Sequence, residues 1–125
     1  MSASGPVITC LRSVAIEEVR KDRLGTLERH FTPSERAAVK GRAAPTVAGM
    51  LALKLAVRAL SGRVGIREVP QTREIELGHE SDGRPLVRVF PGWSGSGFGG
   101  SMFVSISHDQ QNAWGVATLQ QGEKV

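Results

Sequence analysis

Tyrosine is absent from this chain, and cysteine occurs only once, at Cys10. A single cysteine cannot form a disulfide within the chain, so a disulfide-stapled secreted domain is excluded and a reducing, cytoplasmic location is expected. Cys10 lies in an apolar run with Val7, Ile8 and Leu11. We therefore expect it to pack in the core, as most lone apolar cysteines do.

Long apolar runs and a secretion signal are also missing. No stretch approaches the roughly 20 consecutive apolar residues that a membrane span needs. The start of the chain lacks a basic region followed by an apolar segment of sufficient length. The sequence therefore predicts no membrane association, which agrees with a cytoplasmic location.

Aromatic residues make up only 5% of the chain, although its net charge is +4 and its pI is about 10.0. The positive charge favours an anionic partner, and nucleic acid is the first class that it suggests. However, the basic stripe with interleaved aromatic residues that nucleic-acid binders use for stacking is missing. A small basic nucleic-acid-binding domain is therefore an alternative on charge alone, and an acidic protein or a phosphorylated small molecule fits as well.

Clustered metal ligands are missing too. The three histidines, His30, His79 and His108, are scattered along the chain and have no cysteine nearby. Glu17 and Glu18 are adjacent, so on a helix they would point about 100° apart. The sequence therefore predicts no protein-only metal centre.

The overall composition is typical of one globular domain: the chain has 125 residues, of which 40% are hydrophobic and 22% are charged. Such a chain is long enough to bury a core without disulfides or metals. Helical patterns come first and strand patterns follow. The sequence therefore predicts a single α+β domain over residues 1–125, with an N-terminal strand and helices followed by a mainly antiparallel sheet.

The helical half begins after a strand expected at residues 7–14. A helix is predicted over residues 15–31, with a break near Gly25. The next helix has a strong start signal, because Thr32 suits the N-cap, Pro33 the first turn and Glu35 the capping box. It is expected to end near Gly41.

A third helix, over residues 47–61, is predicted to be capped by Thr46 and to stop at Gly62. It is apolar nearly all round, so we expect it at a core or subunit contact. Its narrow polar side is one i, i+4 row made of Met50, Lys54 and Arg58. On this pattern Lys54 is either a cation on the only wet face of the helix or a phosphate ligand.

Period-two alternation then predicts strands over residues 64–69, 73–77, 85–90, 102–107 and 113–119. Asp82-Gly83 marks a turn, and residues 108–112 are expected to join the last two strands as a hairpin. The segment GSGFGG at residues 95–100 spells a dinucleotide-binding motif, but it lacks a strand before it and a helix after it. We predict a flexible loop there.

The stretch SISHD, residues 105–109, contains the residue types of a hydrolase triad. Chain neighbours cannot converge as triad members must, so catalysis by this stretch is excluded. Alternation places Ser105 and Ser107 on the sheet face opposite Val104 and Ile106. His108 then marks a strand end that could face a ligand.

In their order and spacing, these motifs resemble the small, trimeric type of 4′-phosphopantetheinyl transferase, the holo-acyl-carrier-protein synthases. The resemblance extends from Leu11 to Leu119. It is carried by FTPSE at 31–35, AGMLALKLA at 48–56, GRP at 83–85 and VSISHDQQNAWGVA at 104–117.

This resemblance implies a 4′-phosphopantetheinyl transferase-like fold and the Mg²⁺-dependent transfer of phosphopantetheine from coenzyme A to a serine of an acyl carrier protein. It also implies a homotrimer with active sites between subunits and a basic surface for the acidic carrier protein. The coenzyme A-binding positions that it implies are Lys54, Gly83, Arg84, Pro85, Ser105, Ser107 and His108.

This sequence differs from the family's pattern at the positions of the metal ligands. The two carboxylates that hold Mg²⁺ in the family align with Ala15 and Leu55, and aliphatic side chains cannot ligate a hard cation. The resemblance therefore implies a protein with impaired transfer, or a non-catalytic binding role. A working transferase stays open if Glu17, Asp109 or a partner chain supplies replacement ligands.

Overall fold

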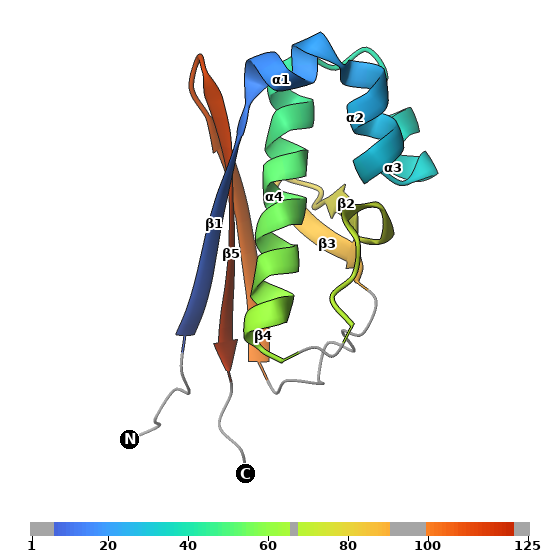
Figure 1. The fold of residues 1–125 in the computed structure, drawn as a ribbon. Helices are drawn as coiled ribbons and strands as arrows, with labels where there is room; N and C mark the ends of the chain where they lie inside the picture. Colours follow the sequence, from blue (N-terminus) through green and yellow to red (C-terminus); the bar gives the residue numbers. More distant parts are fainter. Residues whose placement is uncertain (1–6, 66–67, 91–99, 122–125) are drawn as a thin grey trace.

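A long central helix, α4 (Ala44–Arg63), separates a three-stranded sheet from a group of smaller elements (Figure 1). The computed structural model describes residues 7–65, 68–90 and 100–121. The other described elements are β1 (Val7–Ala15), α1 (Ile16–Lys21), α2 (Arg23–His30), α3 (Pro33–Ala38), the 3₁₀ turn η1 (Thr72–Glu74), β2 (Glu76–His79), β3 (Pro85–Val89), β4 (Gly100–His108) and β5 (Asn112–Gln121).

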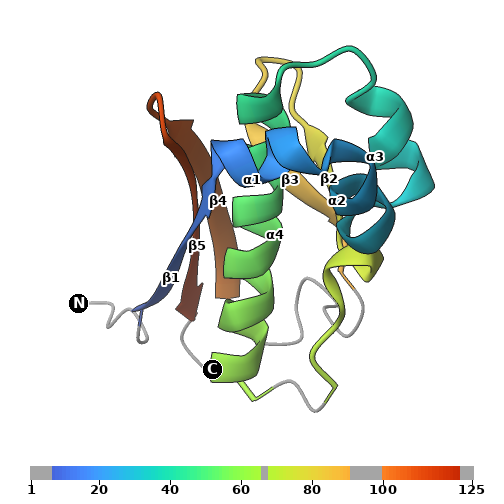
Figure 2. The ribbon, with the colours of Figure 1, turned by 45° about the horizontal axis from the view of Figure 1, so that its top comes forward.

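Both sheets are antiparallel, which confirms the predicted α+β class. The larger sheet has the order β1-β5-β4, so the first strand of the chain lies beside the last. Its register pairs Leu11 with Val116 and Val116 with Ser105. The smaller sheet is the β2-β3 hairpin, which lies with α2 and α3 on the other side of α4 (Figures 1 and 2).

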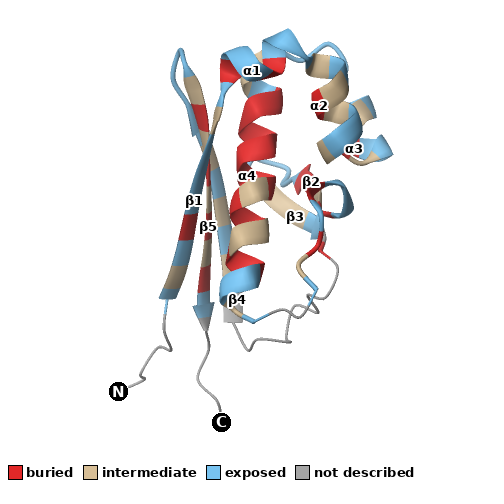
Figure 3. Ribbon diagram, viewed as in Figure 1, coloured by how far each residue is buried: buried red, intermediate tan, exposed pale blue. Residues whose placement is uncertain are grey.

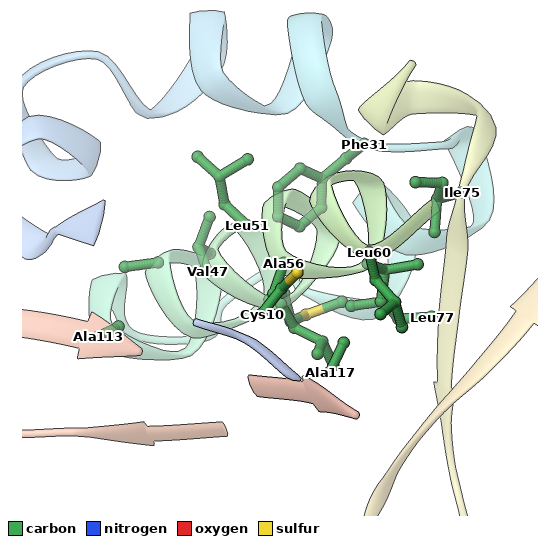
Figure 4. Packing of buried hydrophobic residues seen from close by; sticks show 14 of the residues in the cluster. Cys10, Phe31, Val47, Leu51, Ala56, Leu60, Ile75, Leu77, Ala113 and Ala117 are labelled. Carbon is green, nitrogen blue, oxygen red and sulfur yellow. The ribbon is translucent and has the colours of Figure 1, made fainter. Parts of the chain in front are cut away.

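The core surrounds α4, whose surface is largely buried (Figure 3). Alternate residues of the larger sheet face this helix: Cys10 and Ala117 are paired in the register, and both are buried. Phe31, Ile75 and Leu77 belong to the same cluster, and Phe31 lies on the side of the helix away from Cys10 and Ala117 (Figure 4). The predicted packing role of Cys10 is thus confirmed.

Gly115 sets how closely α4 approaches the sheet. A Cβ atom at this position would lie 2.2 Å from the backbone nitrogen of Leu53 and 2.3 Å from its Cα. These are atoms of the helix backbone, which cannot turn aside as a flexible side chain can. The absence of a side chain at Gly115 therefore lets the helix lie directly on β5.

We expect Gly115→Ala to destabilise the protein by about 2–3 kcal/mol, because the helix must move away from the strand to admit one methyl group. Urea unfolding followed by circular dichroism measures this change. Gly62→Ala is the matched control, since a Cβ there would lie an ordinary 3.7 Å from Val69 Cγ2. Equal stability of the two variants would contradict the close approach.

Several predicted boundaries need correction. The first helix breaks at Asp22 and not at Gly25, because the Asp22 carboxylate accepts a hydrogen bond from Gly25 N and caps α2. Residues 64–69 do not form the predicted strand where they are described: 64–65 are a turn, and 66–67 lie outside the described residues. The strand predicted from residue 73 begins at Glu76, after η1.

The long helix is longer than predicted at both ends. It begins at Ala44 with Pro45 in its first turn, and Thr46 is inside the helix instead of capping it. Proline is favoured there because its fixed φ suits the helix and its missing N–H needs no partner. At the other end Gly62 is helical, and the glycine with positive φ is Gly65, at +83°.

The length of α4 also corrects the prediction that no segment approaches a membrane span. It has 20 residues, and an 18-residue window within it has a mean hydropathy of 1.3, so by length and composition alone it could cross a bilayer. Of that window, 67% is buried inside the fold, so packing in the core accounts for its apolar character.

Candidate functional site

The two positions that align with the family's metal carboxylates lie at the end of β1 and on α4. Ala15 is the last residue of β1 and pairs with Asn112, while the next residue, Ile16, donates from its backbone N–H to Gln111 O over 2.9 Å. Leu55 is half-buried and packs against the core cluster. Neither side chain offers an oxygen atom.

The acidic residues proposed as replacements have other partners. Glu17 is exposed and forms an ion pair with Arg20, whose Nη1 lies 3.3 Å from Glu17 Oε2. Asp109 Oδ1 accepts the backbone N–H groups of Gln111 at 2.7 Å and Asn112 at 2.8 Å. These bonds from Asn112 and Gln111 lower the pKa of Asp109. Asp109 therefore shapes the β4–β5 turn, which confirms the predicted hairpin.

Within the described ranges, no group of three or more histidine, cysteine, aspartate or glutamate residues could hold a metal ion. Magnesium binds oxygen ligands in octahedral geometry, with one or two carboxylates among them. The residues at positions 15 and 55 do not fit this requirement, since they are Ala and Leu.

The polar end of β4 is divided between the two faces of its sheet. Ser105 and Ser107 are exposed and alternate with the half-buried Val104 and Ile106, as predicted. Because successive residues of a strand point to opposite faces, His108 belongs to the face of Ile106. That face packs on the helix, since a Cβ at Gly49 would lie 2.5 Å from Ile106 Cγ2. The strand therefore does not direct His108 and Ser107 to one point.

The predicted turn at Asp82-Gly83 is confirmed. Gly83 has a φ of +91°, which favours glycine, and its N–H donates to Glu80 O over 2.9 Å. Arg84 Nε lies 2.7 Å from Asp82 Oδ2, and both side chains are largely exposed. In the described part of the chain, no hydrogen bond or ion pair links this turn to the end of β4.

Lys54 is not on a wet face, so that expectation is wrong. It is 0% exposed, and its ammonium donates to Glu35 Oε1 and lies 4.8 Å from the centroid of the Phe31 ring. Burial lowers the pKa of Lys54, while the hydrogen bond with Glu35 opposes that change. Lys54 therefore faces Glu35 of α3, not water, while Arg58 of the same row is half-buried and donates to Pro70 O over 3.0 Å.

Glu35 connects three elements, and sequence reasoning missed this role. Its Oε1 also accepts the N–H of Thr32 at 2.9 Å, and its Oε2 accepts the N–H of Leu77 at 2.8 Å. The capping box of Thr32 and Glu35 is thus confirmed. The sequence pattern predicted the capping box, but nothing in it indicated that the same carboxylate also contacts Lys54 and β2.

Of the remaining predictions, the loop predicted at residues 95–100 lies outside the described residues for all but Gly100, which begins β4. The structure gathers Ser105, Ser107 and His108 at one end of β4, and it places the turn at 83–85 on a separate hairpin. Lys54 is enclosed on the other side of α4 from the larger sheet. The seven predicted coenzyme A positions therefore do not form one cluster within a single described chain.

Neither a protein-family model nor a curated protein sequence matches the chain. Solved structures do match, over nearly the whole length. Mycobacterium tuberculosis acyl carrier protein synthase is 27% identical, with a TM-score of 0.69 and coverage of 93% of this chain and 99% of that chain. Helicobacter pylori holo-[acyl-carrier-protein] synthase, solved in complex with coenzyme A, is 27% identical, with a TM-score of 0.71 and coverage of 90% and 99%. The Neisseria meningitidis holo-[acyl-carrier-protein] synthase is 23% identical, with a TM-score of 0.72 and coverage of 93% and 97%.

Proposed function

We propose that this chain, which has the fold of the holo-acyl-carrier-protein synthases, binds coenzyme A and an acyl carrier protein without the Mg²⁺-dependent transfer of phosphopantetheine. The observation that carries this proposal is the pair Ala15 and Leu55, which puts a methyl and an isobutyl group where the family has carboxylates. Coenzyme A is proposed as ligand because the Helicobacter synthase of the same fold was solved with it.

The metal has no place in this proposal. Bound Mg²⁺ would supply charge neutralisation to a departing phosphate group, but it needs oxygen ligands that positions 15 and 55 lack. Glu17 and Asp109 are already engaged by Arg20 and by the β4–β5 turn. The proposed function is therefore binding. The positive net charge of the chain would attract the phosphates of coenzyme A and an acidic carrier protein as well as it would attract nucleic acid.

Arg84 is the cation that we assign to coenzyme A, with Gly83 and Pro85 shaping the turn around it. Its ion pair with Asp82 is exposed and contributes at most about 1 kcal/mol, so a phosphate can displace it. Ser105 and Ser107 would complete the site from the outer face of β4, and His108 would contribute only from the strand end, because its side chain belongs to the opposite face. Lys54 acts indirectly, because its buried ammonium holds Glu35 and thereby fixes α3 and β2.

The outer face of the larger sheet supports the proposed homotrimer. This face carries the half-buried Trp114 and Val116 in its centre and the exposed Leu11 and Phe103 beside them. Leu11 is 54% exposed and Phe103 58%, and no described element covers them. Apolar side chains gathered on one sheet face are typical of a subunit contact. A trimer would also bring Ser105 and Ser107, on this face, next to another chain.

Leu11→Lys is expected to convert the trimer to a monomer, because it places a charge among the apolar side chains of the proposed subunit contact. Sedimentation velocity measures the mass, to be compared with the 13.4 kDa of one chain. Leu24→Lys is the control, since Leu24 is 70% exposed on α2 and away from the sheet. A monomeric wild-type protein would contradict the trimer.

Calorimetry with coenzyme A tests the proposed binding. We expect saturable binding whose affinity is equal in Mg²⁺ and in EDTA within about twofold, and Arg84→Gln is expected to weaken it by about tenfold. Arg73→Gln, an exposed arginine on η1, is the control. Binding that disappears in EDTA, or that Arg84→Gln leaves unchanged, would contradict the proposal.

A cytoplasmic location is part of the same proposal, because coenzyme A and carrier proteins meet there.

A further inference from the structure

Three side-chain hydrogen bonds hold residues 72–77, which we call the strap, against residues 30–35. The strap comprises η1, Ile75 and the start of β2, and it leads into the β2-β3 hairpin. The three bonded pairs are His30 Nδ1 with Thr72 Oγ1 at 2.7 Å, Thr32 Oγ1 with Glu76 Oε1 at 2.8 Å, and Glu35 Oε2 with the N–H of Leu77 at 2.8 Å. The end of α2 and the start of α3 therefore fix the position of the strap.

The two ends of the strap are held by different means. At its C-terminal end, Ile75 and Leu77 are 0% and 5% exposed, so burial in the core adds to the hydrogen bonds. At its N-terminal end, the buried residue of η1 is Thr72, whose hydroxyl bonds to His30. In the part of the chain that the structure describes, no other side-chain hydrogen bond or ion pair joins η1 to α2. The polar attachment of η1 to α2 thus depends on His30.

The surroundings of His30 disfavour a positive charge on its imidazole. Burial and then the positive charges of Arg29 and Lys54 lower the pKa of His30. Arg29 precedes His30 on α2, and Lys54 comes from α4. His30 is the last residue of α2, where the helix dipole favours a cation, but burial and the two cations outweigh this influence. The imidazole is therefore neutral in the folded protein at slightly alkaline pH.

The carboxylates on the elements around His30 already have partners. These pairs are Glu35 with Lys54, Glu76 with Thr32, Glu74 with the N–H of Gln71, and Asp22 with Arg29. Glu28 is two residues before His30 on α2, about 200° around the helix, so it points away. Arg73, the other charged residue of η1, is an exposed cation. None of these carboxylates is therefore placed to pair with a protonated His30.

We propose that His30 is a pH-sensitive latch, whose neutral imidazole holds η1 on α2 and whose protonation releases η1 and the N-terminal end of the strap. An imidazolium can still donate to the Thr72 oxygen, so release comes from the added charge in a half-buried site beside two cations. The C-terminal end of the strap stays in place, because Ile75 and Leu77 remain buried. The latch acts in the protein without ligand, so it goes beyond the proposed function and does not depend on it.

The direction of the pH effect follows from the lowered pKa of His30. Above the ordinary value of 6.5, the imidazole is neutral in both the closed and the released form, and the closed form has its full stability. Below 6.5, the released form takes up a proton more readily than the closed form does. The closed form therefore loses stability as the pH falls, until its own lower pKa is passed.

Hydrogen exchange of the Ile75 backbone amide measures the release, because this N–H donates to Thr72 O over 3.1 Å in the closed form. We expect its protection factor, which corrects for the intrinsic effect of pH on exchange, to fall at least about threefold between pH 7.5 and pH 5.5. The amide of Val57, which is 0% exposed in the middle of α4, is the internal reference for unfolding of the whole domain. Its protection is expected to change by less than about 1.5-fold.

Two variants identify the group that titrates. His30→Gln takes up no proton at this position, so the protection of Ile75 is expected to be equal at the two pH values within about 1.5-fold. His79→Gln removes an exposed histidine of β2 and is expected to keep the pH dependence of the wild type. Circular dichroism checks that both variants are folded.

A third variant tests the contact itself without changing the histidine. Thr72→Val has nearly the same shape but lacks the hydroxyl, so Ile75 is expected to be at least about threefold less protected than in the wild type already at pH 7.5. The latch does not exist if His30→Gln keeps the loss of protection at pH 5.5, or if the wild-type protection of Ile75 changes no more than that of Val57. Both outcomes are independent of whether coenzyme A binds.

Discussion

Lys54→Met is expected to lower the free energy of unfolding by about 3–5 kcal/mol, because it leaves the Glu35 carboxylate buried without its cation. Glu35 is 2% exposed and Lys54 0%, so water cannot replace the lost ammonium. A loss of this size is a large part of the roughly 5–15 kcal/mol that stabilise a typical domain. Urea unfolding at neutral pH, followed by circular dichroism, measures it.

A second variant separates the missing partner from the lost packing of the lysine chain. Glu35→Gln combined with Lys54→Met is expected to recover about half of the loss, because the glutamine is neutral and its oxygen still accepts a backbone N–H. Lys40→Met is the matched control: Lys40 is exposed, and its substitution is expected to change stability by less than about 0.5 kcal/mol. Equal stability of Lys54→Met and Lys40→Met would show that the buried pair contributes nothing.

Ala15→Asp combined with Leu55→Glu is expected to make coenzyme A binding depend on magnesium, whereas the proposed function expects no such dependence in the wild type. The double substitution puts two carboxylates at the positions that align with the family's metal ligands, and magnesium is usually held by one or two carboxylates together with substrate phosphates. We therefore expect Mg²⁺ to tighten coenzyme A binding to this variant by about tenfold or more, as measured by calorimetry.

The isosteric variant Ala15→Asn with Leu55→Gln provides the control, because it has the same shape without the negative charges. Mg²⁺ is expected to leave its coenzyme A affinity unchanged, as in the wild type. Circular dichroism checks that both double variants are folded, since Leu55 is half-buried. If Mg²⁺ acts equally on the two double variants, positions 15 and 55 are not the metal positions.

The fold was predictable from the sequence because its signals are local and agree with one another. The capping box of Thr32 and Glu35 marks α3, and the alternation in β4 marks a half-buried strand. The resemblance to the holo-acyl-carrier-protein synthases is confirmed at the level of the fold by solved structures that cover nearly the whole chain. Exact helix ends were less predictable, since Gly62 and Gly65 both suit a helix end and only the backbone φ distinguishes them.

The candidate site was less predictable because it depends on what lies opposite each residue. The row of Met50, Lys54 and Arg58 indicated a polar face, but periodicity does not tell whether water or a carboxylate covers that face. Glu35, 19 residues before Lys54, supplies the carboxylate. A pocket of about 270 Å³ likewise joins residues from α3, α4, β2 and β3, and no short motif marks such a combination. The division of Ser107 and His108 between opposite sheet faces, in contrast, follows from strand geometry alone.

Mass spectrometry of apo acyl carrier proteins tests the central claim most directly. A panel of them is incubated with this protein, coenzyme A and Mg²⁺, with the Helicobacter synthase as the positive control. We expect no mass change with this protein, although calorimetry under the same conditions shows that it binds coenzyme A or a carrier. A gain of one phosphopantetheine arm, absent without the protein, would show that ligands other than residues 15 and 55 support transfer and would contradict the account.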